Sequence, residues 1–392
     1  MEERRARARR PTMKDIARRA GVSESAVSFA LNDRPGVSEA TRERVRRVAE
    51  HLGWRPSTAA RALSGEGAAT VGLILARPAA TLGVESFFLQ LVSGVQQVLA
   101  ERQLGLLFQV VEDVEAECAT YRRWWAEHRV DGVLVVDPRT TDPRPGLLDS
   151  LGLPTVVIGG TADEGTADAM GAVNATGTAD VTDATGAADA MDATGAPDAT
   201  DVPEGARAAY PTMSTVWADD AGGMALIAGH LHALGHRRVA HIAGLPNLAH
   251  TARRVRSLRA EAARLGFTEA RSVPTDYSDA EGAAATRRVL AEPDPPTAIV
   301  YDNDVMAAAG AAVITAAGLS VPGDVSVVSW EDSVLCRVVH PWLTALGRDT
   351  IAFGRTAAEE LTALLDGGAA RVARVPPPEL IVRESTAPPP GR

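Results

Sequence analysis

The chain has 392 residues, 45% of them hydrophobic, which is enough for two or three folded domains. No apolar run approaches the roughly 20 residues that a membrane-spanning helix needs. The charged start "MEERRARARR" lacks the apolar stretch of a secretory signal, so we expect a cytoplasmic protein without membrane contact. Two cysteines far apart in the sequence argue against a disulfide framework or a structural zinc site, and we predict neither a metal nor a cofactor.

The net charge of −10 is unevenly distributed along the chain. Residues 1–65 contain 15 Arg and Lys against 8 Asp and Glu, whereas the remainder contains 25 against 42. A basic head on an acidic body indicates a polyanionic partner for the head alone. We interpret residues 1–10 as a disordered basic tail.

Three short helices are predicted in the basic head. The first covers residues 13–20, after which Gly21 permits a sharp turn. Ser23 is placed to cap the second helix, and Ser38 to cap the third. Two helices joined by a tight turn are typical of a helix-turn-helix domain, which we assign to residues 1–57.

The second helix, "VSESAVSFALN", has an unusual polar side. At about 100° per residue, one arc of the helix carries Glu24, Ser25, Ser28, Phe29 and Asn32, opposite the apolar Val27, Ala30 and Leu31. Solvated helix faces usually carry long charged residues, but these side chains are short and include no lysine or arginine. We therefore expect another molecule to approach this face closely.

One more short helix is predicted after Pro56, over residues 58–66. Isolated helices shorter than roughly 12 residues are marginal in water. We expect this segment to become ordered only when something packs against it.

Residues 67–392 alternate strand-like apolar runs, such as "TVGLILA" and "DGVLVVD", with helical patterns. This alternation favours parallel, doubly wound sheets. Two such series predict a core of two α/β lobes, and the crevice between them is the expected ligand site.

Residues 161–209 interrupt this pattern. They contain ten acidic residues, one arginine and no aromatic residue, with an imperfect "DATG" repeat. Such a segment buries too little apolar surface to offset its ordering entropy, so we predict a disordered surface insertion. A calcium-binding repeat is not favoured, because the spacing matches no 12-residue loop with a closing Glu.

The sequence resembles the lactose-repressor (LacI/GalR) family of bacterial transcription regulators. The resemblance lies in "PTMKDIARRAGVSESAVSFALNDRPGVSEATRERVRRVAEHLGWRPSTAARALSG", in "GHRRVAHIAG", in "YDNDVMAAAGAAVITAAGLSVPGDVSVVSWED" and in "LIVREST". It implies an all-α helix-turn-helix head, a hinge helix and a two-lobed α/β core like that of periplasmic binding proteins.

The resemblance also implies a role for the polar arc, namely contact with the major groove of DNA. Glu24 and Ser25 match the family positions that contact bases, and Phe29 stands where an arginine is common. Phe29 can pack on a thymine methyl but cannot form the bidentate guanine contact of arginine; alternatively, it packs into the core of the head. Phosphate contacts are expected from the remaining polar positions, which are Thr12, Ser23, Ser28 and Asn32.

The predicted helix at 58–66 is similar to the family's hinge. Ala60 and Leu63 occupy the positions that enter the minor groove at the centre of the operator, where an apolar wedge kinks the duplex. Leu63 could instead pack between the lobes.

In the core, the family's effector-contacting positions fall on Phe88, Arg254, Asn303 and Glu331. Arginine suits ligand hydroxyls or carboxylates, and the Asn303 amide both donates and accepts hydrogen bonds. We expect Arg253 and Arg256 to be solvated. Structural or capping roles are expected for Asp302, Asp304 and Asp332, and core packing for Trp217 and Trp330.

Taken together, these features predict a homodimeric repressor. It would bind a pseudo-palindromic operator under the control of a small ligand held between the lobes, for which we expect a sugar or a related metabolite. The alternatives are a glycoside-processing enzyme that uses Asp302 and Glu331 as an acid–base pair, and a solute-binding module. A metal site at His230, His232 and His236 is not favoured, because no carboxylate or cysteine lies nearby in the sequence.

Overall fold

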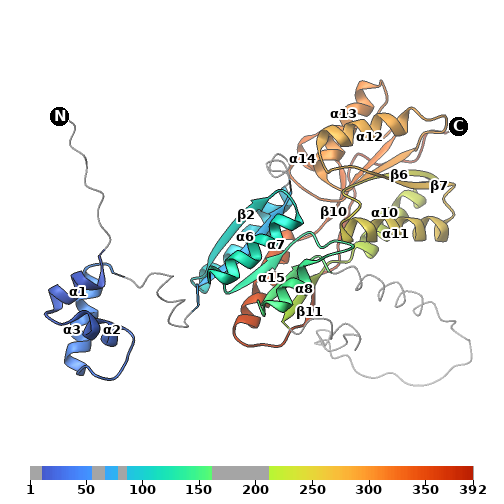
Figure 1. Cartoon of the computed structure of the whole chain (residues 1–392). Helices are drawn as coiled ribbons and strands as arrows, with labels where there is room; N and C mark the ends of the chain where they lie inside the picture. The colour runs from blue at the N-terminus through green and yellow to red at the C-terminus, as the bar shows by residue number, and fades with distance from the viewer. Residues whose placement is uncertain (1–10, 55–66, 78–85, 161–211, 392) are drawn as a thin grey trace, which may run out of the picture. The chain divides into compact units, whose positions relative to one another are not determined.

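The computed structural model describes residues 11–54, 67–77, 86–160 and 212–391 (Figure 1). The chain divides into two compact units, Met1–Ala68 and Ala69–Arg392. The predicted basic tail at 1–10, the insertion at 161–209 and the hinge at 58–66, with Ala60 and Leu63, lie outside the described residues.

The first unit contains the three predicted helices, α1 (Met13–Ala20), α2 (Glu24–Leu31) and α3 (Glu39–His51). The helix boundaries have local causes. Gly21 adopts the left-handed conformation that ends α1. The Ser23 hydroxyl accepts a hydrogen bond from the Ala26 amide at 3.2 Å, and the Ser38 hydroxyl accepts one from the Thr41 amide at 3.3 Å. The three helices enclose a small core, whose buried residues are Ile16, Ala17, Ala20, Val27, Ala30, Val45 and Ala49.

The second unit is built on two six-stranded sheets, one in each lobe. The first-lobe sheet is parallel throughout. Its strand order is β11-β5-β4-β3-β1-β2, with β1 (Thr70–Ala76), β2 (Gly105–Val111), β3 (Gly132–Val135), β4 (Thr155–Ile158), β5 (Met213–Trp217) and β11 (Val372–Arg374).

Four helices cover the first sheet. One face packs against α6 (Ser86–Glu101) and α15 (Thr350–Leu365), and the other against α7 (Val114–Ala126) and α8 (Arg144–Ser150). Helices α6 and α15 cross closely at Gly94 and Gly354, because a Cβ on either glycine would clash with the backbone of the other helix.

The second-lobe sheet has the order β12-β10-β9-β8-β6-β7. Its strands are β6 (Arg238–Ala243), β7 (Glu269–Pro274), β8 (Ala298–Tyr301), β9 (Ser326–Ser329), β10 (Thr344–Gly347) and β12 (Glu379–Ile381). All pairs are parallel except β10 with β12, which is antiparallel. Parallel sheets were therefore predicted correctly, apart from this edge strand.

Helices also cover both faces of the second sheet. On one face lie α12 (Asp279–Leu290), α13 (Asp304–Ala316) and the short α14 (Leu335–Val338). On the other face lie α10 (Asp220–Ala233) and α11 (Ala249–Leu265). Among the described residues, no helix combines the length and hydrophobicity needed to cross a membrane.

The chain passes between the lobes three times, after β5, after β10 and after β11. The return of α15 and β11 to the first lobe was not anticipated from the sequence, since their patterns do not specify which sheet they join. As a result, the segments at the crossings border both lobes.

Candidate functional site

The polar arc of α2 is on the surface of the head. Glu24, Ser25 and Asn32 are exposed and Ser28 is half-buried, while Val27 and Ala30 are buried on the opposite side. The side-chain hydrogen bonds of this arc are few and local: Asn32 Nδ2 donates to Ser28 Oγ at 3.4 Å, and Ser25 Oγ lies 2.9 Å from Oγ of the neighbouring Ser23. Most of the arc's donors and acceptors are thus available to another molecule.

Phe29 lies at the edge of this arc, with 37% of its surface exposed. It is absent from the buried core of the head, so the alternative that it packs there is wrong. Its ring lies beside Gly36, where a Cβ would approach Phe29 Cδ2 to 3.3 Å. The aromatic edge is therefore presented at the surface next to the polar side chains.

Thr12 and Ser23, which are predicted to contact phosphates, also form hydrogen bonds that stabilise helix N-termini. The Thr12 amide and hydroxyl both donate to Asp15 Oδ2, at 2.9 and 2.7 Å, at the start of α1. Ser23 caps α2. Both residues stand at helix N-termini, where backbone amides favour anions such as phosphate.

The second candidate site is a pocket between the two lobes of the core. Its wall is formed largely at the carboxyl ends of parallel strands, the usual ligand position in open α/β sheets. The lining residues that directly follow strands are Arg77, Val136, Gly159 and Ala218 in the first lobe, and Asp302 and Arg348 in the second.

All four predicted effector-contacting residues line this pocket, namely Phe88, Arg254, Asn303 and Glu331. They come from α6, from α11, from the N-terminus of α13 and from the segment after β9. The structure thus brings together positions that lie far apart in the sequence, although their contact with a ligand stays a prediction.

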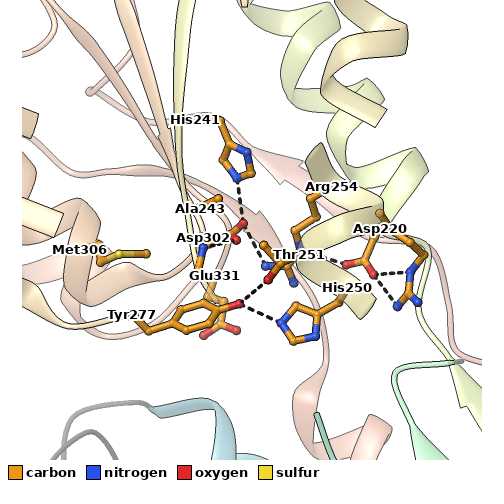
Figure 2. A network of polar contacts seen from close by, with 12 residues as sticks. Asp220, His241, Ala243, His250, Thr251, Arg254, Tyr277, Asp302, Met306 and Glu331 are labelled. Carbon is orange, nitrogen blue, oxygen red and sulfur yellow. Dashed lines mark hydrogen bonds and ion pairs between the residues drawn. The ribbon is translucent and has the colours of Figure 1, made fainter. Parts of the chain in front are cut away.

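Arg254 is at the centre of a buried polar network (Figure 2). Its Nε donates to Asp220 Oδ1 at 3.1 Å, and its Nη1 forms an ion pair with Asp302 Oδ1 at 3.0 Å. Its guanidinium lies 4.1 Å from the centre of the Trp330 ring. These contacts fix the orientation of the guanidinium before any ligand arrives.

Arg253 is not solvated, contrary to the expectation from the sequence. It is only 4% exposed, its Nε and Nη2 donate to Asp220 Oδ2 at 3.1 and 2.9 Å, and Nη2 also donates to the Gly159 carbonyl. Arg253 is buried because Asp220, at the start of α10, forms ion pairs with both Arg253 and Arg254. Arg256 is exposed, as expected.

Asp302 is fully engaged by the protein, which agrees with its expected structural role. Its Oδ1 accepts from His241 Nε2 at 2.9 Å, and its Oδ2 accepts from the Gly244 amide at 2.8 Å, in addition to the Arg254 ion pair. Burial alone would raise the pKa of Asp302, but Arg254 and His241 hold that pKa well below its ordinary value. A carboxyl group held ionised in this way is a poor general acid.

The Asn303 side chain caps α13. Its Oδ1 accepts from the Met306 amide at 2.8 Å and its Nδ2 donates to the Tyr277 carbonyl at 3.0 Å. These two bonds leave fewer groups for a ligand than the sequence suggested.

The Glu331 carboxylate forms fewer contacts with the protein than the Asp302 carboxylate does. Its Oε1 lies 3.3 Å from Arg348 Nη2, at the crossing after β10. Burial raises the pKa of Glu331 to about 7, and the nearby Arg348 opposes that rise only in part. Glu331 thus differs from Asp302, whose pKa is lowered and which has three partners.

Sequence reasoning missed six charged or polar wall residues, which are Arg77, Asp137, Asp220, His250, Tyr277 and Arg348. Arg77 Nε donates to Asp137 Oδ2 at 2.6 Å, and its guanidinium lies 5.1 Å from the Phe88 ring and 4.9 Å from the Tyr277 ring. Arg77 and Asp137 follow β1 and β3 closely, so their place at strand ends was a usable signal.

Tyr277 belongs to the second lobe and is held by α11. Its hydroxyl contacts His250 Nε2 at 2.8 Å and Thr251 Oγ1 at 3.0 Å (Figure 2). Burial, assisted by Arg254, lowers the pKa of His250 to about 3. The imidazole is therefore neutral near pH 7.

The lobes also meet through backbone contacts beside the pocket. The Ala249 amide donates to the Pro138 carbonyl at 2.7 Å, and the Thr140 amide donates to the Asn247 carbonyl at 2.9 Å. With the Arg253–Gly159 bond, these contacts hold the two lobes against each other.

The histidines of "HLHALGH" have other partners. His236 is buried and bonds to Thr297, Ser326 and the Ala387 carbonyl, while His230 bonds to Thr386 Oγ1. Trp217 and Trp330 are buried in the core.

Comparison with known proteins identifies both parts of the chain. Residues 12–57 match the model of bacterial regulatory proteins of the lacI family, and residues 228–386 match the periplasmic binding protein-like domain. The HTH-type transcriptional regulator CelR of Thermobifida fusca is 30% identical over 385 residues, covering 97% of this chain and 99% of CelR. The HTH-type transcriptional repressor PurR of Aliivibrio fischeri (strain MJ11) is 28% identical, covering 89% and 90%.

Solved structures give the same result. A transcriptional regulator CelR–cellobiose complex superposes with a TM-score of 0.64 at 28% identity, covering 96% of this chain and all of the other. The lac repressor dimer bound to operator and the anti-inducer ONPF superposes with a TM-score of 0.73, covering 97% and 100%; at 22% identity it shows the fold alone. The glycoside-processing alternative is wrong, since the relatives are named as regulators. The chain belongs to the lacI family of bacterial regulatory proteins and is a DNA-binding transcriptional regulator, not an enzyme.

Proposed function

We propose that this regulator is a cytoplasmic homodimeric repressor, whose affinity for a pseudo-palindromic operator is set by a small molecule bound between the lobes of its core. The observation that carries the proposal is the pairing of two sites in one chain. One is a helix with an exposed polar arc in the head, and the other is a pocket lined by Phe88, Arg254, Asn303 and Glu331.

The DNA-binding part of the proposal rests on α2. Its short exposed side chains allow the helix to enter the major groove, where Glu24, Ser25 and Phe29 would meet base edges. Thr12, Ser23, Ser28 and Asn32 would meet phosphates and fix the register. Ala60 and Leu63 of the predicted hinge would enter the minor groove at the operator centre.

The effector part rests on the pocket. Aromatic faces from Phe87, Phe88 and Tyr277 alternate there with charged and amide groups, a combination that suits the C–H faces and hydroxyls of a sugar. Because one similar structure is a complex with cellobiose, cellobiose is the first probe to use.

A second copy of the chain is the proposed partner of an exposed apolar patch around α14. Val334, Val338 and Trp342 lie close together in the sequence around α14 and are 65, 61 and 45% exposed, and exposed apolar groups that cluster mark interaction sites. Sedimentation should show a dimer for the unmodified chain and a shift toward monomer for Val338→Glu. A monomeric unmodified chain would contradict the homodimer.

The operator is tested by selecting sites from random duplex DNA with the purified full-length chain at moderate salt. A two-fold symmetric consensus with a central CpG is expected. A selection that enriches no sequence, alone and in the presence of pooled sugars, would reduce the head to nonspecific binding.

Regulation is tested on the selected operator. Cellobiose and a panel of sugars and metabolites should include a molecule that changes operator affinity several-fold, and Arg254→Ala should abolish that response while leaving affinity without ligand largely intact. Arg256→Ala is the matched control, because this exposed arginine lies two residues further along α11 and outside the pocket wall.

A further inference from the structure

Each arginine that lines the described pocket is matched by a carboxylate of the same wall. The nitrogen–oxygen distances are 2.6 Å for Arg77–Asp137, 3.0 and 3.1 Å for Arg254 with Asp302 and Asp220, and 3.3 Å for Arg348–Glu331. The positive charges of Arg77 and Arg254, which an anionic ligand would need, are therefore already balanced by ionised carboxylates inside the protein.

Asp302 is the most firmly fixed of these carboxylates. It is 1% exposed, and His241 Nε2, the Gly244 amide and Arg254 Nη1 all lie within 3.0 Å of its oxygens. His241 is itself held by Ser272 Oγ at 3.0 Å on its other nitrogen. Asp302 cannot rotate away from Arg254 without losing several hydrogen bonds, so it stays in place when a ligand enters.

This arrangement distinguishes between ligand classes. A phosphate or carboxylate that bound Arg254 would be placed close to Asp302 and Asp220, and such like-charge juxtaposition disfavours binding. A hydroxyl group does not meet this obstacle, since it accepts from the guanidinium and donates to a carboxylate at the same time. Arg254 retains N–H donors for such a contact, because its bonds to the described residues use Nε–H and one Nη1 hydrogen of the five N–H hydrogens of the guanidinium.

We propose that Asp302 is a specificity-determining residue whose charge prevents anionic ligands from binding Arg254. The pocket then accepts uncharged, hydroxyl-rich molecules and rejects their phosphorylated counterparts. The proposal rests on the proposed function, in which this pocket holds the effector. It goes further by naming the residue that excludes anions.

The test is anion binding by full-length Asp302→Asn, a change that removes the charge and keeps the size. Isothermal titration at constant ionic strength would use inorganic phosphate and glucose 6-phosphate, with glucose as the uncharged counterpart of the latter. The unmodified chain should not bind the two anions measurably. Asp302→Asn should bind glucose 6-phosphate with an affinity roughly tenfold or more above the weakest binding that the titration detects, because one of the two repelling carboxylate charges is gone.

Asp332→Asn is the matched control. Asp332 also pairs with arginines, Arg337 at 3.2 Å and Arg383 at 2.8 Å, but it is outside the lining of this pocket. It should gain no affinity for either anion. An equal gain in both variants would overturn the proposal, because any released arginine would then suffice.

Two further results would also overturn it. One is a folded Asp302→Asn variant with no gain in anion affinity. The other is binding of glucose 6-phosphate by the unmodified chain more tightly than glucose, a comparison that decides the matter even where Asp302→Asn fails to fold. The second result would contradict the role of Asp302 but would still agree with the proposed function, in which this pocket holds a small-molecule effector. The proposed function itself fails if no ligand changes operator affinity, and the anion titration stays valid in that case.

Discussion

The exposed arc of α2 and the wall of the interlobe pocket are both polar, but they are built in opposite ways. On α2 the side chains are short and exposed, and they make few contacts beyond their own helix. In the pocket the side chains are long and charged, and they are buried in ion pairs such as Arg254–Asp220 and Arg77–Asp137.

The proposed partners of the two surfaces account for this difference. DNA brings its own dense charge and counterions, so the head can leave its groups open to solvent. A small ligand contributes few contacts, so its pocket must be ordered in advance. Stability should therefore depend strongly on the pocket residues and weakly on the α2 arc.

The largest effect is expected for Asp220→Ala. This change leaves the buried Arg253 and Arg254 without their shared carboxylate, and breaking a buried ion pair from one side costs about 3–5 kcal/mol. Urea unfolding of the full-length chain measures the loss. Asp366→Ala, which removes an exposed pair with Arg102, should lower the free energy of unfolding by less than about 1 kcal/mol. Equal losses in the two variants would contradict the expected dependence of stability on the buried pocket residues.

A pH effect of up to about 3 kcal/mol is expected from Glu331. Its pKa is raised from 4.5 to about 7 in the folded chain, so the folded chain holds this proton more tightly than the unfolded chain. The resulting stability is fully present below pH 4.5 and is lost as the pH rises to about 7.

Glu331→Gln should therefore make the free energy of unfolding less dependent on pH between about 4.5 and 7. Comparing the variant with the unmodified chain cancels the contributions of other groups, and Glu127→Gln at an exposed site is the control. A Glu331→Gln curve parallel to that of the unmodified chain would show that Glu331 is not the group responsible.

Ser23→Ala should destabilise the head by about 1 kcal/mol through loss of the α2 cap. Amide hydrogen exchange in α1–α3 should accelerate by about fivefold as a result, with no change in the core. Ser25→Ala removes a neighbouring hydroxyl that caps nothing, so protection lost equally in both variants would refute the capping role.

The smallest stability effect is expected for Phe29→Ala, within about 0.5 kcal/mol, since the ring is at the surface of the head. Its effect on DNA should be larger. Repeating the site selection should show loss of a preference for thymine at one position of each half-site, worth about 1 kcal/mol. An unchanged consensus would indicate that Phe29 does not contact bases.

The helices of the head could be predicted almost to the residue, because their causes are local. Gly21, Ser23 and Ser38 end or begin helices through contacts within a few residues. The sheets could also be anticipated from their apolar runs. The membership of α15 and β11 in the first lobe could not, because the pattern of a helix or strand does not specify its partner.

The residues of the pocket could also be predicted only in part from the sequence. The family resemblance selected Phe88, Arg254, Asn303 and Glu331, and all four line the pocket. It did not show that Arg253 is buried, since that depends on Asp220 of another helix. Nor did it indicate that the Asn303 amide caps α13 and bonds Tyr277.

The sequence by itself determined the helix-turn-helix head, the alternation of strands and helices in the core, and the family to which the chain belongs. These features depend on periodicity, capping residues and motifs, all of which act over short stretches of chain. Only the tertiary structure decided how the charges of the pocket are paired, because Arg254, Asp220 and Asp302 lie on three different segments. Their protonation and orientation follow from burial and proximity, which arise only when these segments of the second lobe have folded together.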